Sequence, residues 1–307
     1  MFLEKRWAQY VFLLLMALIW GSSFILMKIG LKSFDSNQAA AIRIFSASAV
    51  LLPVSIYHLR KLKWHDLRGL LIAGFIGSFF PAFLFTKAQT QIDSAMAGML
   101  NSLTPMFTLL IGILFYNIQT SRMQVIGMLL GLVGAAGLIS WGEDLSLANI
   151  NSYAFYIVLA TFFYGISMNE IKIRLAHLTG MQITGFMFLL LLPAALGYLL
   201  YTDFDGVTQN PAWGYHLLAL VTLGVVGTAL ALTLMNTLIG YVQPVFVSST
   251  TYIVPVFAVF WGVVDGEQVL PVHILFMLLI LFGVYLINTK GKIRIVAHAR
   301  LLRRKKF

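Results

Sequence analysis

Two stretches of the sequence carry side chains that could hold a small organic molecule. Each places aromatic, hydroxyl and apolar or thioether side chains three or four residues apart, on one face of an α-helix. The two stripes are Trp20, Ser23, Phe24 and Met27, and Tyr164, Ser167, Met168 and Ile171. A ligand cavity between the two helices would explain the stripes, and so would ordinary helix packing. We predict a substrate-binding site that includes Trp20, Ser23, Phe24, Tyr164 and Ser167.

Four neutral polar residues lie deeper in apolar segments, where a partner must satisfy their hydrogen-bonding groups. They are Asn101, Thr104, Asn236 and Thr251. Hydrogen bonds between helices would satisfy these groups without any ligand. We predict that all four contact the substrate, together with Tyr252, which follows Thr251.

Lys87 is the most notable charged residue within an apolar run, and it lies close to the end of that run. Its ammonium group either reaches the membrane interface or forms a basic mouth that holds a carboxylate or phosphate. We include Lys87 in the predicted substrate site. Arg43 also lies near a segment end, and we expect a structural role for it, through an ion pair with Asp35 or contact with the interface.

Pro105 and Pro255 lie inside apolar segments. A proline within a helix removes one amide donor and clashes with the carbonyl of the preceding turn, which produces a kink. A purely structural bend is one explanation. The equivalent placement of the two prolines favours a moving element, and we predict that both act as hinges or gates.

No group of residues has the spacing of an intramembrane catalytic site. The chain contains no cysteine, no His-Glu-x-x-His zinc motif and no Walker lysine motif. Its acidic residues lie in loops or at segment ends, which argues against proton coupling through a carboxylate in the middle of the membrane. We therefore predict no catalytic residue, no metal and no cofactor, and the protein is not expected to be an enzyme.

The composition places all these residues in a membrane protein. Of the 307 residues, 60 % are hydrophobic and only 10 % are charged, with a mean hydropathy of +0.88. Soluble domains carry about 25 % charged residues. The net charge of +10 is better explained by the positive-inside rule than by nucleic-acid binding. The fold class is therefore an all-α integral membrane protein.

Apolar runs long enough to cross a membrane, about 20 residues each, occur ten times. They lie near residues 10–31, 38–58, 68–90, 95–115, 123–142, 152–171, 181–201, 215–237, 245–264 and 270–288. We expect ten transmembrane helices.

The fifth span, near residues 123–142, carries four glycines suited to tight helix contact, within one protomer or in a dimer.

The second half of the chain repeats the first. Gly74 and Gly77 recur roughly 150 residues later as Gly224 and Gly227. Pro105 recurs at the same offset as Pro255. Five spans per copy is an odd number, so the two copies have inverted topology, as in many secondary transporters. We predict one repeat over 1–145, a second over 146–290 and a basic cytoplasmic tail over 291–307.

Charges bordering the spans orient the chain. With a cytoplasmic N-terminus, most of the 21 Lys and Arg residues face inward and most of the 11 acidic residues face outward. We expect a multi-pass protein of the plasma membrane, in a bacterium the inner membrane, with both termini in the cytoplasm.

Several short motifs, in this order and in an inverted repeat, resemble the EamA family of the drug/metabolite transporter superfamily. They are Trp20-Gly21-Ser22-Ser23-Phe24, Arg43, Leu103-Thr104-Pro105, Val254-Pro255-Val256-Phe257 and Gly266-Glu267. The resemblance implies a central cavity between two five-helix halves and movement of small metabolites, often export. Asn117 departs from the family, which usually carries Glu at that position, and Lys87 replaces an aromatic or neutral residue.

These observations together predict a secondary transporter, an exporter or facilitator of small amphipathic metabolites such as amino acids, working by alternating access. A lipid scramblase or flippase, or a membrane sensor with the same fold, remains an alternative. The expected partners are a small-molecule substrate and membrane lipid, without nucleic acid, for a monomer or homodimer.

Overall fold

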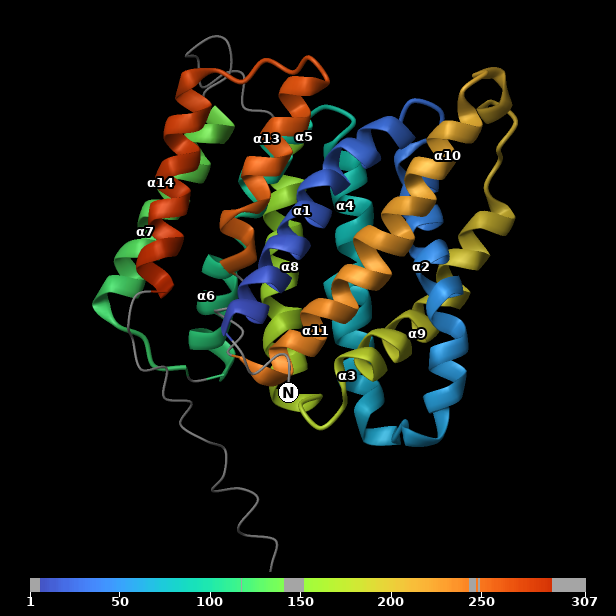
Figure 1. The fold of residues 1–307 in the computed structure, drawn as a ribbon, viewed down its shortest axis with the longest axis horizontal. Coiled ribbons are helices and arrows are strands. Elements are labelled where there is room, and N and C mark those ends of the chain that lie inside the picture. Colours follow the sequence, from blue (N-terminus) through green and yellow to red (C-terminus); the bar gives the residue numbers. More distant parts are fainter. Residues whose placement is uncertain (1–5, 117, 141–151, 243–246, 248, 289–307) are drawn as a thin grey trace, which may run out of the picture.

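The computed structural model describes residues 6–116, 118–140, 152–242, 247 and 249–288, which form a bundle of helices (Figure 1). The helices of the first half are α1 (Arg6–Gly30), α2 (Ser36–His58), η2 (Leu59–Lys61), η3 (Trp64–Asp66), α3 (Leu67–Leu71), η4 (Ile72–Phe79), α4 (Phe80–Ala88), α5 (Ser94–Asn101), α6 (Thr104–Tyr116) and α7 (Arg122–Ser140). Those of the second half are α8 (Ala154–Arg174), α9 (Gly180–Tyr201), η6 (Val207–Gln209), α10 (Trp213–Thr222), η7 (Leu223–Leu230), α11 (Ala231–Tyr241), η8 (Ser249–Tyr252), α13 (Val254–Val264) and α14 (Pro271–Asn288).

Eight helical segments are long and apolar enough to cross a membrane, and two shorter apolar helices, Thr250–Val264 and Pro271–Ile287, follow them among the described residues. Large hydrophobic side chains such as Leu18, Leu129 and Phe282 are exposed on the outside of the bundle, as expected where lipid is the solvent. An all-helical integral membrane fold is therefore confirmed, whereas ten spans stay a prediction. Asn117, the boundary between residues 145 and 146, and the tail over 291–307 lie outside the described residues.

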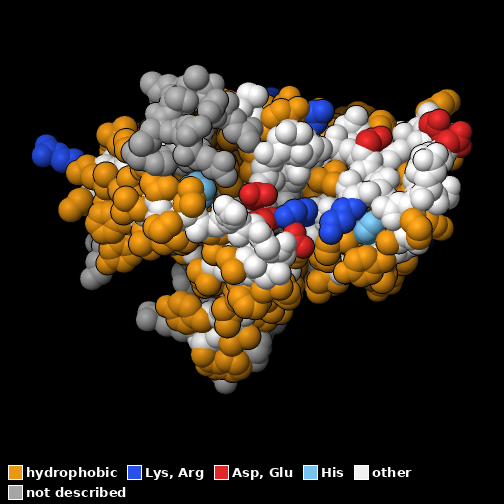
Figure 2. Space-filling model, turned by 90° about the horizontal axis from the view of Figure 1, so that it is seen from above, with side chains coloured by type: hydrophobic (Ala, Val, Ile, Leu, Met, Phe, Trp, Pro, Cys, Tyr) orange, Lys and Arg blue, Asp and Glu red, His pale blue; other side chains and the backbone are white. Residues whose placement is uncertain are grey.

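The helix connections alternate between two faces, named here from Figure 1. The upper face carries the α1–α2, α4–α5 and α13–α14 connections, and the lower face carries the α2–α3, α6–α7 and α8–α9 connections. Seen from above, acidic and basic side chains meet near the middle of the upper face, and hydrophobic side chains surround them (Figure 2).

Local sequence sets where helices α2 and α9 begin. The Asp35 carboxylate accepts hydrogen bonds from the Asn37 and Gln38 amides at 2.7 and 2.9 Å, and the Gln38 side chain accepts from the Asp35 amide at 3.0 Å. Thr179 and Gln182 form the same reciprocal pair at the start of α9. Such a capping box satisfies amides that the first helical turn leaves without partners.

The Gly-x-x-Gly segments found in the sequence form the two wide helical turns of the structure. Helices η4 and η7 are π-helical. The amide of Phe80 donates to the carbonyl of Phe75, and the amide of Ala231 donates to that of Val226, each five residues earlier. Single π-turns are uncommon and often lie at functional sites. The sequence repeat is therefore matched by a repeat of this unusual backbone geometry.

The two prolines interrupt their segments instead of kinking a continuous helix, so the predicted kink was wrong in form. Helix α5 ends at Asn101 and α6 begins at Thr104, which places Pro105 in the first turn of α6. Pro255 likewise lies in the first turn of α13, after the short helix η8. The first turn is where a missing amide costs nothing, because that amide has no helical partner.

The glycines of span 5 bring α7 against α14 within one protomer. A Cβ atom at Gly283 would lie 2.8 Å from the amide nitrogen of Gly131, and one at Gly134 would lie 2.8 Å from the side chain of Ile280. Small residues allow helix backbones to approach this closely in membranes. Of the two expected uses of this face, the structure shows packing within the protomer.

Candidate functional site

A large cavity lies between helices of both halves. It encloses about 1020 Å³ of empty space, its mouth included. Its wall combines many apolar side chains with a few polar ones, as is usual in sites for small molecules. The lining comes from α1, α2, η4, α4, α5, α6, α8, α9, η7, α11 and η8.

Both side-chain stripes identified in the sequence line this cavity. The lining includes Trp20, Ser23, Phe24, Met27, Tyr164, Ser167, Met168 and Ile171. It also includes the deeper polar residues Asn101, Thr104, Asn236 and Thr251. A helical period of 3.6 residues was therefore sufficient to place the members of each stripe on one face of their helix. Binding of a substrate by them stays a prediction.

Two residues of the predicted site lie elsewhere. Lys87 is exposed in the last turn of α4, and its ammonium nitrogen lies 6.0 Å from the centre of the Tyr153 ring. Tyr252 is partly buried in the hydrophobic core and is not a lining residue. Its neighbour Thr251 lines the cavity, so the difference is one of side-chain direction.

Arg43 lines the cavity, and the expected ion pair with Asp35 does not form. Its Nε donates to Thr228 Oγ1 at 2.8 Å. Asp35, the expected partner, instead caps the start of α2. Within the described chain, no carboxylate lies within ion-pair distance of Arg43. The sequence did contain the signal, because Asp35 precedes Arg43 by about two helical turns, too far for a direct pair.

Other hydrogen-bonding groups of the cavity are only partly satisfied. The Asn236 side-chain amide donates to Thr184 Oγ1 at 2.9 Å, while its carbonyl oxygen Oδ1 is buried and has no hydrogen-bond partner among the described residues. The buried hydroxyl of Ser78, which the sequence analysis missed, also lacks a partner. Buried polar atoms of this kind are normally paired, so both are positioned to meet a ligand.

Hydrogen bonds fix the walls around these groups. Trp20 Nε1 donates to the carbonyl of Gly227 at 3.1 Å, which joins α1 to η7. Ser102 Oγ donates to the carbonyl of Thr251 at 3.0 Å, so the interruptions before the two prolines contact each other. The Asn101 carbonyl accepts from Thr104 Oγ1 at 2.8 Å. The carbonyls of Asn101 and Thr251, next to the helix interruptions, therefore each accept a hydrogen bond within the protein.

A charged cluster ties three segments together at the upper face. Lys28 Nζ lies 2.7 Å from Asp265 Oδ2 and 2.8 Å from Glu267 Oε1. The Glu267 carboxylate also accepts hydrogen bonds from the amides of Ser94 and Ala95, both at 2.9 Å. This upper cluster, Lys28, Asp265, Glu267, Ser94 and Ala95, therefore links the end of α1, the start of α5 and the α13–α14 connection.

Two more carboxylates, those of Asp93 and Glu170, contribute to the electrostatics of the upper and lower faces. Partial burial raises the pKa of Asp93, beside the upper cluster, and the negative charge of Glu267 acts in the same direction. At the lower face, Glu170 is buried; Tyr116 donates to its carboxylate at 2.7 Å, and Arg174 pairs with it at 2.6 Å.

Comparison with known proteins places this geometry in a family. The model of the EamA-like transporter family matches the chain twice, over residues 7–140 and 151–289. The Escherichia coli protein named "Uncharacterized inner membrane transporter YedA" is 30 % identical over 289 residues, covering 90 % of this chain and 88 % of that protein. The Salmonella typhimurium "Probable amino-acid metabolite efflux pump" is 25 % identical, covering 91 % and 93 %.

A solved crystal structure aligns over 99 % of this chain and 100 % of its own, with a TM-score of 0.63 at 17 % identity, which supports the fold alone. The two family matches cover nearly the whole described chain, and the helices match a multi-pass membrane protein. The two relatives are named as an inner membrane transporter and a probable efflux pump. The chain therefore belongs to the EamA-like transporter family.

Proposed function

We propose that this protein is a secondary transporter that moves small amphipathic carboxylates, such as amino acids, by alternating access between two inverted repeats. The observation that carries the proposal is Arg43, a guanidinium group in the wall of the central cavity without a carboxylate partner in the described chain. Taking one charge out of water costs several kcal/mol. A substrate carboxylate would supply the missing negative charge.

Arginine suits this role because its planar fork can form two parallel hydrogen bonds with one carboxylate. Thr228 occupies only Nε, which leaves the terminal nitrogens available. Asn236 Oδ1 and Ser78 Oγ, both buried and without partners, supply acceptors for the ammonium group of an amino acid. The three residues together match a zwitterion better than a hydrocarbon or a cation.

Aromatic rings account for the amphipathic part of the substrate. Trp20, Phe24 and Phe85 line the cavity with Tyr164, and the rings of Phe85 and Tyr164 stack with centroids 6.0 Å apart. Ligand sites commonly combine such an apolar wall with a few polar groups. The name of the Salmonella relative, an amino-acid metabolite efflux pump, supports the same substrate class and export.

Contacts between the halves support inverted repeats. A Cβ at Gly227 would lie 2.8 Å from Ser23 Oγ, and Gly77 packs in the same way against Ser167. Each pair joins the third span of one half to the first span of the other. This reciprocal arrangement is what a two-fold axis in the membrane plane produces.

The upper cluster makes the two faces of the protein different, because its ion pairs are not repeated, within the described residues, around Lys172, the equivalent lysine of the second half. Lys172 corresponds to Lys28 in the repeat, but it donates to the carbonyl of Ile239 at 3.2 Å instead of pairing with an acid. We propose that the lower face is cytoplasmic, because Arg60, Lys61 and Lys63 lie there, and that the upper cluster is the extracytoplasmic gate.

Transport in proteoliposomes tests the substrate class. Labelled amino acids should move, and their carboxamides should move about ten- to hundredfold more slowly, because a hydrogen-bonded charge contributes about 1.5 to 3 kcal/mol. Arg43→Gln should remove this preference. Arg122→Gln, which alters an exposed arginine on the lower face, serves as the matched control and should keep it.

Equal rates for acids and amides in the native protein would refute carboxylate recognition. The same vesicles, loaded with a fluorescent lipid, separate the alternative function: lipid movement without any solute transport would identify a scramblase. Monodisperse elution of Arg43→Gln in detergent shows that the variant is folded.

A further inference from the structure

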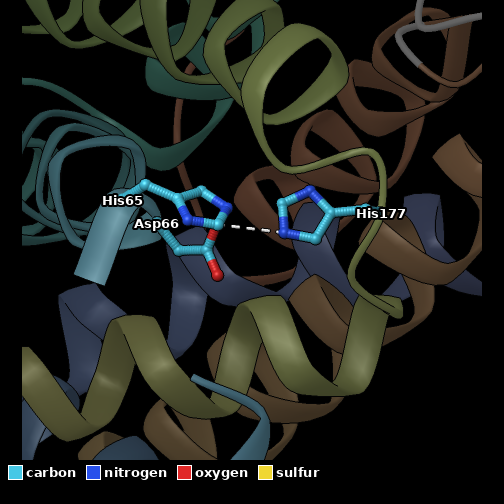
Figure 3. A group of neighbouring side chains, drawn as sticks. All are labelled: His65, Asp66 and His177. Atoms are coloured by element: carbon cyan, nitrogen blue, oxygen red, sulfur yellow. Dashed lines mark ion pairs between the residues drawn. The ribbon is translucent and has the colours of Figure 1, made fainter. Parts of the chain in front are cut away.

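A second group of side chains with ligand chemistry lies outside the cavity, on the lower face. His65 and Asp66 belong to η3, in the connection between α2 and α3, and His177 lies between α8 and α9. Figure 3 shows the three side chains pointing toward one another from these two loops. The nitrogen Nε2 of His65 lies 3.1 Å from Asp66 Oδ1, and that of His177 lies 3.0 Å from the same oxygen.

These distances match a metal-binding set. One donor atom from each residue lies within 4.8 Å of the other two. Around a tetrahedral zinc ion, with bonds of about 2.0 to 2.2 Å, neighbouring ligand atoms lie about 3.3 to 3.5 Å apart. The two contacts of 3.1 and 3.0 Å are within a few tenths of an ångström of that separation, so small side-chain movements would admit the ion.

The burial of Asp66 is an independent indication that something is bound there. Its side chain is 0 % exposed, and Oδ1 receives no hydrogen bond of acceptable geometry although two imidazole nitrogens are close to it. The other oxygen accepts from the Lys63 amide at 3.3 Å. A buried carboxylate normally pairs with a hydrogen-bond donor or a metal, and a metal ion shared with the two imidazole nitrogens would satisfy this oxygen.

Access to the site is open on the histidine side. The side chains of His65 and His177 are 67 % and 43 % exposed, so an ion can enter from water and keep a water molecule as fourth ligand. Two histidines with one carboxylate are a common ligand set for zinc. Acidic oxygen ligands are too few here for calcium or magnesium, which prefer six or more oxygen atoms, several of them from water for magnesium.

We propose that His65, Asp66 and His177 bind one divalent transition-metal ion, with Zn²⁺ as the best match, and that the ion ties the α2–α3 loop to the α8–α9 loop. The site joins the two halves of the chain, because its ligands come from both. It does not depend on the substrate proposed for the cavity. No linear motif reveals it, since the ligands come from two distant loops.

The test is Zn²⁺ binding by the purified full-length chain in detergent, prepared with a tag that contains no histidine and stripped with a chelator. Isothermal titration with Zn²⁺ should give one tight site per chain and raise the melting temperature. His177→Ala should weaken binding at least tenfold, as expected on loss of one of three ligands. His58→Ala changes the last residue of α2, whose ring contacts the Val54 carbonyl, and it should leave binding unchanged.

A second readout reports geometry directly. Co²⁺ in place of Zn²⁺ should give the intense visible bands of a four-coordinate ion, and these bands should be lost in His177→Ala. Equal Zn²⁺ affinity in the native protein and His177→Ala would overturn the proposal. So would the absence of saturable binding in the native protein, which would leave the cluster as an ion pair between Asp66 and the two imidazoles.

Discussion

Replacing Glu267 by glutamine should open the upper face of the protein. In the structure the Glu267 carboxylate is 2 % exposed, pairs with Lys28 and accepts the amides of Ser94 and Ala95. Glutamine has one acceptor oxygen and a donor NH₂ group in place of the second oxygen. In Glu267→Gln the NH₂ group must face one of these donors, and the ion pair with Lys28 is lost.

The magnitude follows from these contacts. Removing one partner of a buried ion pair costs about 3 to 5 kcal/mol. Because Lys28 is partly exposed, we expect a cost near the lower limit of this range. A cost of about 3 kcal/mol, confined to the state with a closed upper face, shifts the closed-to-open equilibrium about a hundredfold.

The sequence makes the assay simple, because the native chain has no cysteine. A single Ser78→Cys substitution places a thiol in the cavity wall, and a membrane-impermeant maleimide added at the upper face reports its accessibility. Labelling should be up to about a hundredfold faster with Glu267→Gln than without it. Asp205→Asn, which neutralises an exposed acid, is the matched control. Equal labelling rates for the Glu267→Gln and Asp205→Asn proteins would refute the assignment of the upper cluster as a gate.

Two further outcomes are expected. Gly283→Ala should lower the melting temperature in detergent, because the added Cβ meets the α7 backbone at Gly131 and overpacking costs about 1 to 3 kcal/mol; Gly197→Ala, where nothing lies within 4 Å of the new Cβ, should not. Lys87→Gln should leave the KM for amino acids unchanged, since Lys87 lies outside the cavity, and a severalfold rise would return Lys87 to the substrate site.

The sequence predicted the residues of the cavity wall best where they lie within one continuous helix. Trp20 and Ser23 share a face whatever their surroundings, so three- and four-residue spacing was enough to group them. The sequence could not show that Tyr252 points away while Thr251 points inward, because a helix break changes side-chain direction locally. Pro105 was correctly identified as a disruption, but whether a proline kinks or restarts a helix depends on how its neighbours satisfy the backbone.

Charged residues were harder to place from the sequence. Arg43 and Lys87 both lie near segment ends, yet only Arg43 faces the cavity. That difference depends on which face of each helix packs inward, and a nearly uniform apolar sequence carries little information about it. His65 and His177 come together only through the docking of two loops, which no local pattern encodes.

The upper cluster also has a consequence for how the chain is made. Helix α5 begins at Ser94, but its own N-cap residue Asp93 makes no side-chain cap. Its first amides are capped by Glu267, at a sequence separation of 173 residues. At about 5 to 20 residues per second, a ribosome needs roughly 10 to 35 s to add that length. During biogenesis, the first amides of α5 therefore lack their capping carboxylate until Glu267 has been synthesised. The first half of the chain, synthesised alone, would insert with this helix end uncapped.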